Sequence, residues 1–122
     1  MIKFKSLNQS DEFVKILKRK KMDNKYFTIY FKKNSNNLEN KINKYLNISF
    51  VMKKKLGNAV RRNKIKRKLK FAVQKILKED KPIDLSYTYV ILGKRNVYND
   101  KFALVFNEVN EVFKKIKRKD IY

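Results

Sequence analysis

Residues 58–78 combine a strongly basic composition with apolar residues at helical spacing. The apolar side chains of this segment are Ile65, Leu69, Ala72, Val73 and Ile76. Their spacing places them along one side of an α-helix, and such a stripe is normally buried against another layer of the protein. Asn58, directly after Gly57, is a suitable N-cap residue for this helix. The pattern therefore predicts a helix with one buried face and contradicts a solvated basic tail.

The remaining periodic segments supply the elements that this helix can pack against. We predict a short helix at 11–19 and a last helix from about residue 100. The last helix should contribute Phe102, Phe106 and Phe113 to the hydrophobic core of the protein. Strands are predicted at 26–33, 45–53 and 86–94, after a basic connection at 18–25 that has a brief extended piece.

The polar segment 34–41 favours a hairpin between the strands at 26–33 and 45–53. The strand at 86–94 is apolar on both faces, so we expect it in the middle of the sheet. The order helix, strands, helix, strand, helix predicts the α+β class: a single domain, residues 1–122, built as a two-layer α/β sandwich on a small sheet.

The composition excludes several classes of protein. The chain has no cysteine and no histidine, which removes disulfides, thiolate metal sites and the commonest general base. Its acidic residues are scattered, without the spacing of metal ligands or of an acid/base pair. No apolar stretch approaches the roughly 20 residues that span a bilayer, and the N-terminus lacks the apolar region of a signal peptide. We therefore expect a soluble cytoplasmic protein without catalytic residues of its own.

The dominant property of the chain is its formal net charge of +22. No acid occurs between Glu39 and Glu79, whereas the same span holds fourteen Lys or Arg residues. Three of the six arginines, Arg61, Arg62 and Arg67, lie in this span, where planar bidentate donors suit phosphate. The alternative is that these are solubilising charges on an ordinary helix, but such helices usually mix signs. The pattern favours a polyanionic partner, above all a nucleic acid.

Aromatic residues give a second, weaker signal. Tyr26, Tyr30, Tyr87 and Tyr89 fall on the predicted strands. One face of the sheet could stack unpaired bases on such rings. Ordinary sheet core remains the alternative for each of them.

The segment GNAVRRNKIKRKLK, residues 57–70, resembles the signature of the bacterial ribonuclease P protein component, G-N-A-V-x-R-N-R-I-K-R. The matching residues are Gly57, Asn58, Ala59, Val60, Arg62, Asn63, Ile65, Lys66 and Arg67. Lys64 stands where the pattern has its second arginine. Length, charge and element order agree with the family over nearly the whole chain.

The resemblance implies a mixed four-stranded sheet in the order α-β-β-β-α-β-α, with a left-handed β-α-β crossover, as in a domain of a ribosomal protein. It also implies that an RNA subunit with bound Mg²⁺ removes the 5′ leader of precursor tRNA while the protein assists. The implied partners are ribonuclease P RNA and precursor tRNA, with no membrane and no obligate protein partner.

Two sets of binding residues follow from the resemblance and the basic pattern together, and neither set is catalytic. The residues expected to bind the RNA subunit are Lys54, Lys55, Asn58, Arg61, Arg62, Asn63, Lys64, Lys66, Arg67 and Lys68. The residues expected to line a cleft for the leader are Phe13, Leu17, Phe27, Tyr30 and Lys53.

Other nucleic-acid-binding classes remain as alternatives. A structural RNA-binding protein, such as a ribosomal protein with the same sandwich, is the first. A DNA-binding protein that places the basic helix in a major groove is the second. The length of the motif argues against both, and the chain lacks an obvious dimer element that would set half-site spacing.

Overall fold

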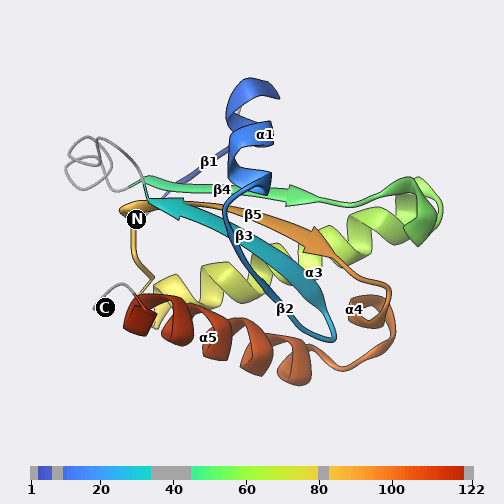
Figure 1. Cartoon of the computed structure of the whole chain (residues 1–122). Helices are drawn as coiled ribbons and strands as arrows, with labels where there is room; N and C mark the ends of the chain where they lie inside the picture. Colours follow the sequence, from blue (N-terminus) through green and yellow to red (C-terminus); the bar gives the residue numbers. More distant parts are fainter. Residues whose placement is uncertain (1–2, 7–9, 34–44, 80–82, 120–122) are drawn as a thin grey trace.

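A mixed β-sheet with helices on both faces organises the chain (Figure 1). The computed structural model describes residues 3–6, 10–33, 45–79 and 83–119. Within these residues the strands are β1 (Lys3–Lys5), β2 (Lys20–Asp23), β3 (Phe27–Lys33), β4 (Tyr45–Val51) and β5 (Tyr87–Gly93). The helices are α1 (Ser10–Leu17), the 3₁₀ helix η1 (Lys54–Leu56), α3 (Ala59–Lys78), α4 (Asn96–Asn99) and α5 (Phe102–Lys119).

The sheet has five strands in the order β1-β4-β5-β3-β2, in the part of the chain that the structure describes. Strand β5 lies at its centre, antiparallel to β3 and parallel to β4, as its two apolar faces predict. The predicted count of four strands was too low because β1, only three residues long, carries too short a pattern to be recognised. Strand β1 pairs with β4 in parallel.

The predicted hairpin between residues 26–33 and 45–53 is wrong, because β5 lies between β3 and β4. Strand β3 forms its hairpin with β2 instead. The Asn24 side chain closes that turn by accepting hydrogen bonds from the backbone of Tyr26 at 2.8 Å and of Phe27 at 3.1 Å. The segment 34–41, which we expected to connect the hairpin, lies outside the described residues.

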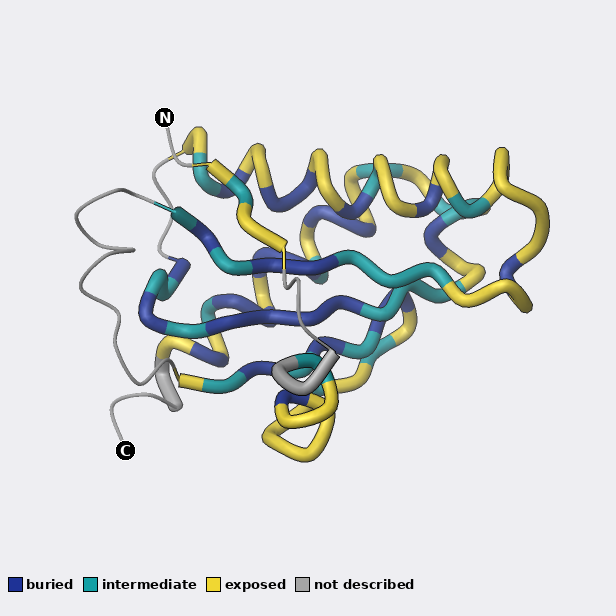
Figure 2. The backbone as a smooth tube through the Cα atoms, turned by 90° about the horizontal axis from the view of Figure 1, so that it is seen from above, coloured by how far each residue is buried: buried dark blue, intermediate teal, exposed yellow. Residues whose placement is uncertain are grey.

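The predicted β-α-β crossover is confirmed as β4, α3 and β5. Strands β4 and β5 are parallel neighbours, and α3 returns along the face of the sheet that lies underneath in Figure 1. With α3 beneath the sheet in Figure 1 and β5 parallel to β4 beside it in Figures 1 and 2, the crossover is left-handed. Such connections are right-handed in about 98% of proteins, so this hand is a distinctive property of the fold.

The main core lies between the sheet and the helices α3 and α5. The predicted stripe of α3 is fully buried there, together with Val105, Val109, Phe113 and Ile116 of α5. Strand residues Ile29, Phe31 and Tyr89 meet these helices from the sheet. The α3 prediction was therefore correct in extent, in its N-cap and in its buried face.

Helix α1 covers part of the opposite face of the sheet (Figure 1). Ile16 anchors it and is buried, whereas Val14 and Leu17 are exposed. Among the described residues, none of the helices has the length and apolar character that crossing a bilayer requires.

Candidate nucleic-acid interface

The interface begins at the turn that precedes α3. Asn58 has an extended backbone, and its side-chain oxygen accepts a hydrogen bond from the backbone N–H of Arg61 at 2.9 Å. This is the predicted N-cap, and it satisfies one of the free donors of the first helical turn. The N–H of Gly57 donates to the carbonyl of Lys54 at 3.1 Å, so it is used inside the turn.

Gly57 occupies a backbone conformation that other residues rarely adopt, with φ of 126°. A Cβ at this position would lie 2.8 Å from Cδ of Arg61. Glycine therefore lets the Arg61 side chain lie close against the turn, where its guanidinium stands 4.9 Å from the centroid of the Tyr98 ring. The turn fixes both the start of α3 and the place of its first arginine.

A continuous basic surface follows, which we call the α3 surface. Its exposed members are Lys53, Lys54, Lys55, Arg61, Asn63, Lys64, Lys66, Arg67 and Lys70. Figure 2 shows this exposure along η1 and along the side of α3 away from the sheet. The ion pairs that join described residues involve other cations: Lys25, Lys75, Lys94 and Lys114. The α3 surface thus presents its charge without neutralisation by any described carboxylate.

Arg62 is half-buried, unlike its neighbours. Its Nε atom is shielded from solvent and has no hydrogen-bond partner among the described residues. A buried donor without a partner is costly, so this side chain is under-satisfied in the isolated protein.

Lys68 does not belong to the open surface. It is half-buried, and its ammonium donates to the carbonyl of Val97 at 2.8 Å and to that of Asp100 at 2.5 Å. Binding of the RNA subunit by Lys68 stays a prediction, whereas the structure shows that its ammonium ties α3 to the end of α4. Periodicity alone does not show which lysine of a basic helix meets carbonyls of another element.

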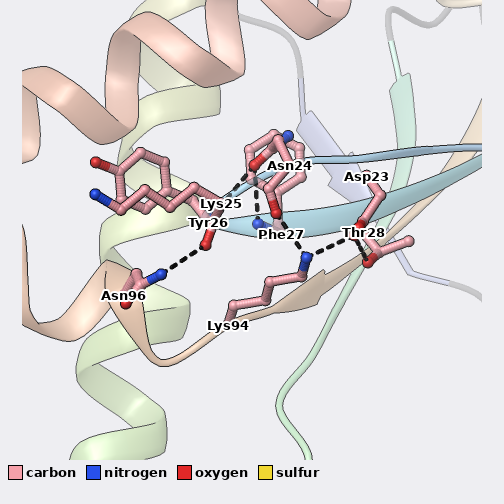
Figure 3. A network of polar contacts seen from close by, with 8 residues as sticks. All are labelled: Asp23, Asn24, Lys25, Tyr26, Phe27, Thr28, Lys94 and Asn96. Carbon is pink, nitrogen blue, oxygen red and sulfur yellow. Dashed lines mark hydrogen bonds and ion pairs between the residues drawn. The ribbon is translucent and has the colours of Figure 1, made fainter.

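A polar network holds α4 against the β2–β3 turn (Figure 3). The ammonium of Lys94 lies 2.6 Å from a carboxylate oxygen of Asp23 and 2.6 Å from the carbonyl of Asn24. Asn96 donates to the carbonyl of Lys25 at 3.2 Å. Hydrogen bonds from Lys94 and Thr28 hold the pKa of Asp23 below its usual value. The network fixes the segment that carries Tyr98.

Asp100 extends this support from the other end of α4. It accepts a hydrogen bond from the Tyr26 hydroxyl at 2.7 Å and lies 3.2 Å from the Lys25 ammonium. These bonds lower the pKa of Asp100, and the bond to Asp100 raises the pKa of Tyr26.

The residues expected to bind the leader divide between the two faces of the sheet. Phe27 is fully buried in the main core with Ile29 and Phe31, so its place in the predicted cleft is wrong. Side chains alternate along a strand, so Tyr30 points to the other face, where α1 lies.

Phe13 and Tyr30 are half-buried, and Leu17 is exposed on α1. These three residues lie on the α1 side of the sheet. Lys53 is exposed beyond the end of β4, directly before η1, so the structure groups it with the α3 surface. Of the four strand tyrosines, Tyr26 and Tyr89 are buried and Tyr87 packs against the main core.

The aromatic residues that surround the basic helix were not predicted from the sequence. Tyr98 lies on α4, a helix of four residues that is too short to show a periodic pattern. Phe71 lies off the apolar stripe of α3 and is 57% exposed. The signal in the sequence that could have shown this was Phe71, an aromatic residue that is out of phase with the buried face of α3.

Residues 1–117 match the protein family described as Ribonuclease P. The chain belongs to the ribonuclease P family. The ribonuclease P protein component of Carboxydothermus hydrogenoformans is 29% identical over 119 residues, which are 97% of this chain and 96% of that protein. The same component of Mesoplasma florum is 32% identical over 112 residues, 88% of this chain and 91% of that protein.

The fold agrees with this assignment. The solved RNase P protein of Thermotoga maritima superposes with a TM-score of 0.72 at 23% identity, covering 91% of this chain and 96% of that one. The resemblance of residues 57–70 is thus confirmed at the level of the family, and ribonuclease P is a tRNA-processing activity.

Proposed function

We propose that the chain binds the RNA subunit of ribonuclease P through the α3 surface. The observation that carries this proposal is a capped basic helix on which the cations of the α3 surface have no described carboxylate partner. A net charge of +22 destabilises a compact protein by self-repulsion, and a phosphate backbone relieves it. The open arginines offer bidentate bonds to phosphate, and Lys64 offers a point charge.

We propose that the RNA subunit, with its bound Mg²⁺, hydrolyses the phosphodiester. Among the described residues, no three acidic, histidine or cysteine side chains gather into a group that could hold a metal ion. The contribution of the protein is binding and charge neutralisation.

We further propose that the α1 side of the sheet binds the 5′ leader of precursor tRNA. Tyr30 offers a partly accessible ring on β3, and Phe13 and Leu17 add apolar surface from α1. Single-stranded RNA binds such surfaces by stacking, which contributes about 1–3 kcal/mol per base.

Reconstitution tests the proposed function. Purified protein should accelerate cleavage of precursor tRNA by a bacterial ribonuclease P RNA at low Mg²⁺ concentration, where unscreened RNA charge limits the reaction. Cleavage should occur at the mature 5′ end. No acceleration with any bacterial ribonuclease P RNA would contradict the proposal.

The leader proposal has its own test. Tyr30→Ala should weaken binding of the reconstituted enzyme to precursor tRNA by about 1–3 kcal/mol and leave binding of mature tRNA unchanged. An equal loss for both substrates would place the role of Tyr30 in the fold and not in leader binding.

A further inference from the structure

A pocket opens between α3, α4 and the start of α5, on the side of the sheet opposite α1. Its volume is about 540 Å³, which is within the range of pockets that hold small ligands, roughly 300–1,000 Å³. Its lining combines cations and aromatic rings: Lys64, Arg67, Lys68, Phe71, Tyr98 and Phe102.

The aromatic wall of the pocket is accessible. The rings of Phe71 and Phe102 meet edge to face, with centroids 5.3 Å apart. Phe71 is 57% exposed, so much of its ring surface remains uncovered by the protein. A nucleobase is a planar apolar group that can cover such a ring without regard to sequence.

One cation of the pocket is bonded to protein carbonyls, and the others are free to bind a ligand. The ammonium of Lys68 is bound to carbonyls, so this residue contributes its aliphatic stem to the wall. Arg67 is exposed and has no ion pair or side-chain hydrogen bond with a described residue. The Lys64 ammonium stands 5.8 Å from the centroid of the Tyr98 ring. Two cations are thus placed at the mouth, next to a face that can stack a base.

The pocket is built before any ligand arrives. Tyr98 is carried by α4, which Lys68 ties to α3 and which the network of Figure 3 ties to the β2–β3 turn. A wall held on both sides loses little freedom when a ligand binds, and this lowers the cost of binding.

We propose that this pocket takes one unpaired nucleotide of the RNA subunit. Its base stacks on the rings of Phe71 and Tyr98, and its phosphate is held by Arg67 and Lys64. The occupant belongs to the RNA subunit and not to the leader, because the pocket adjoins the α3 surface and the sheet separates it from the α1 side. The inference rests on the proposed binding of ribonuclease P RNA.

Substitution of Phe71 tests the base stack. Phe71→Leu keeps an apolar side chain but removes the ring, and it should weaken binding of ribonuclease P RNA by about 5- to 150-fold. Phe71→Tyr should restore the wild-type affinity. Leu104→Ala, at an apolar α5 residue that is 51% exposed and outside the pocket lining, should leave affinity unchanged. Thermal melts of all variants check that the fold is intact.

Chemical footprinting of the RNA in the complex locates the nucleotide. At least one unpaired base should be protected by the wild-type protein and by Phe71→Tyr, and should become reactive again with Phe71→Leu. Protection that is the same with all three proteins would overturn the inference, as would equal RNA affinities of wild type and Phe71→Leu.

The possible results distinguish a failure of the pocket proposal from a failure of the proposed function. Normal RNA affinity of Phe71→Leu together with weaker binding of precursor tRNA would assign the pocket to the substrate and overturn the inference. If the wild-type protein does not bind ribonuclease P RNA, the proposed function fails and the inference fails with it. If wild type binds and Phe71→Leu binds equally well, only the inference fails.

Discussion

The Gly57–Asn58 turn decides where α3 begins and how its basic surface is presented. Gly57 combines φ of 126° with ψ of −160°, a region that is essentially restricted to glycine. Asn58 then caps the helix. Both residues belong to the sequence motif, so part of the motif is explained by backbone geometry and not by contact with RNA.

Substitution of the cap should separate these two roles. Asn58→Ala should lower the free energy of unfolding by about 1 kcal/mol, because the Arg61 N–H loses its acceptor. Asn63→Ala, at an exposed position of the same helix, should change it by less than about 0.5 kcal/mol. Chemical denaturation measures both values, and equal values would show that Asn58 does not act as a cap.

The bond between Tyr26 and Asp100 should make stability depend on acid pH. The pKa of Asp100 is lowered in the folded protein, so its carboxylate stabilises the fold above the unfolded-state pKa of about 3.9. This contribution is lost as the pH falls through the lower folded-state pKa.

Asp100→Asn should therefore melt below wild type at neutral pH, and the difference should shrink as the pH falls below the unfolded-state pKa of about 3.9. Tyr26→Phe, which removes the same bond, should converge with wild type in the same way. A difference in melting temperature that does not change with pH would show that the Asp100 charge is not involved.

Single residues could be predicted from the sequence where one pattern dominated. The buried stripe of α3 and its N-cap follow from spacing and residue type. Phe27 could not be placed, because aromatic residues occupy both faces of its strand. Its burial is decided by α3 and α5, which are distant in the sequence and cover only one face.

At the scale of elements, Lys68 connects α3 to α4. Lys68→Met keeps the length of the side chain but leaves the carbonyls of Val97 and Asp100 without their donor. It should lower the free energy of unfolding by about 1–3 kcal/mol. Lys66→Met, at an exposed site of the same helix, should change it by less than about 0.5 kcal/mol. A similar effect of both substitutions in urea denaturation would contradict the tether.

Strand pairing could be predicted only in part. The central place of β5 follows from its two apolar faces. The pairing of residues 26–33 with 45–53 was inferred from their succession in the chain, and about a third of successive strands are not neighbours. The Asn24 turn, which holds β2 against β3 with short-range bonds, is the feature that decides the hairpin. Helix α4 depends on tertiary bonds and has no periodic signal of its own.

For the whole molecule, net charge dominates. Because the protein carries a net charge of +22, salt should act in opposite directions on its thermal stability and on its binding of RNA. Raising KCl from about 50 mM to about 200 mM should raise the melting temperature by screening self-repulsion. It should also weaken RNA binding, because the counterions released from the RNA gain less entropy in a more concentrated salt solution. Melts and binding titrations in the same buffers check both. If salt lowered both the melting temperature and the affinity for RNA, repulsion among the charges would not be destabilising the free protein.

The central claim is that RNA binding is a local property of the α3 surface and not of the bulk charge. Arg67→Glu and Lys115→Glu test it directly, because both sites are exposed and both substitutions change the net charge by the same amount. Arg67 lies on α3 and Lys115 on α5.

The decisive measurement is the dissociation constant for ribonuclease P RNA at one fixed salt concentration. Arg67→Glu should raise it by about 10- to 150-fold more than Lys115→Glu, as expected for lost charge-assisted bonds to phosphate. Equal increases for the two variants would contradict a localised docking surface on α3.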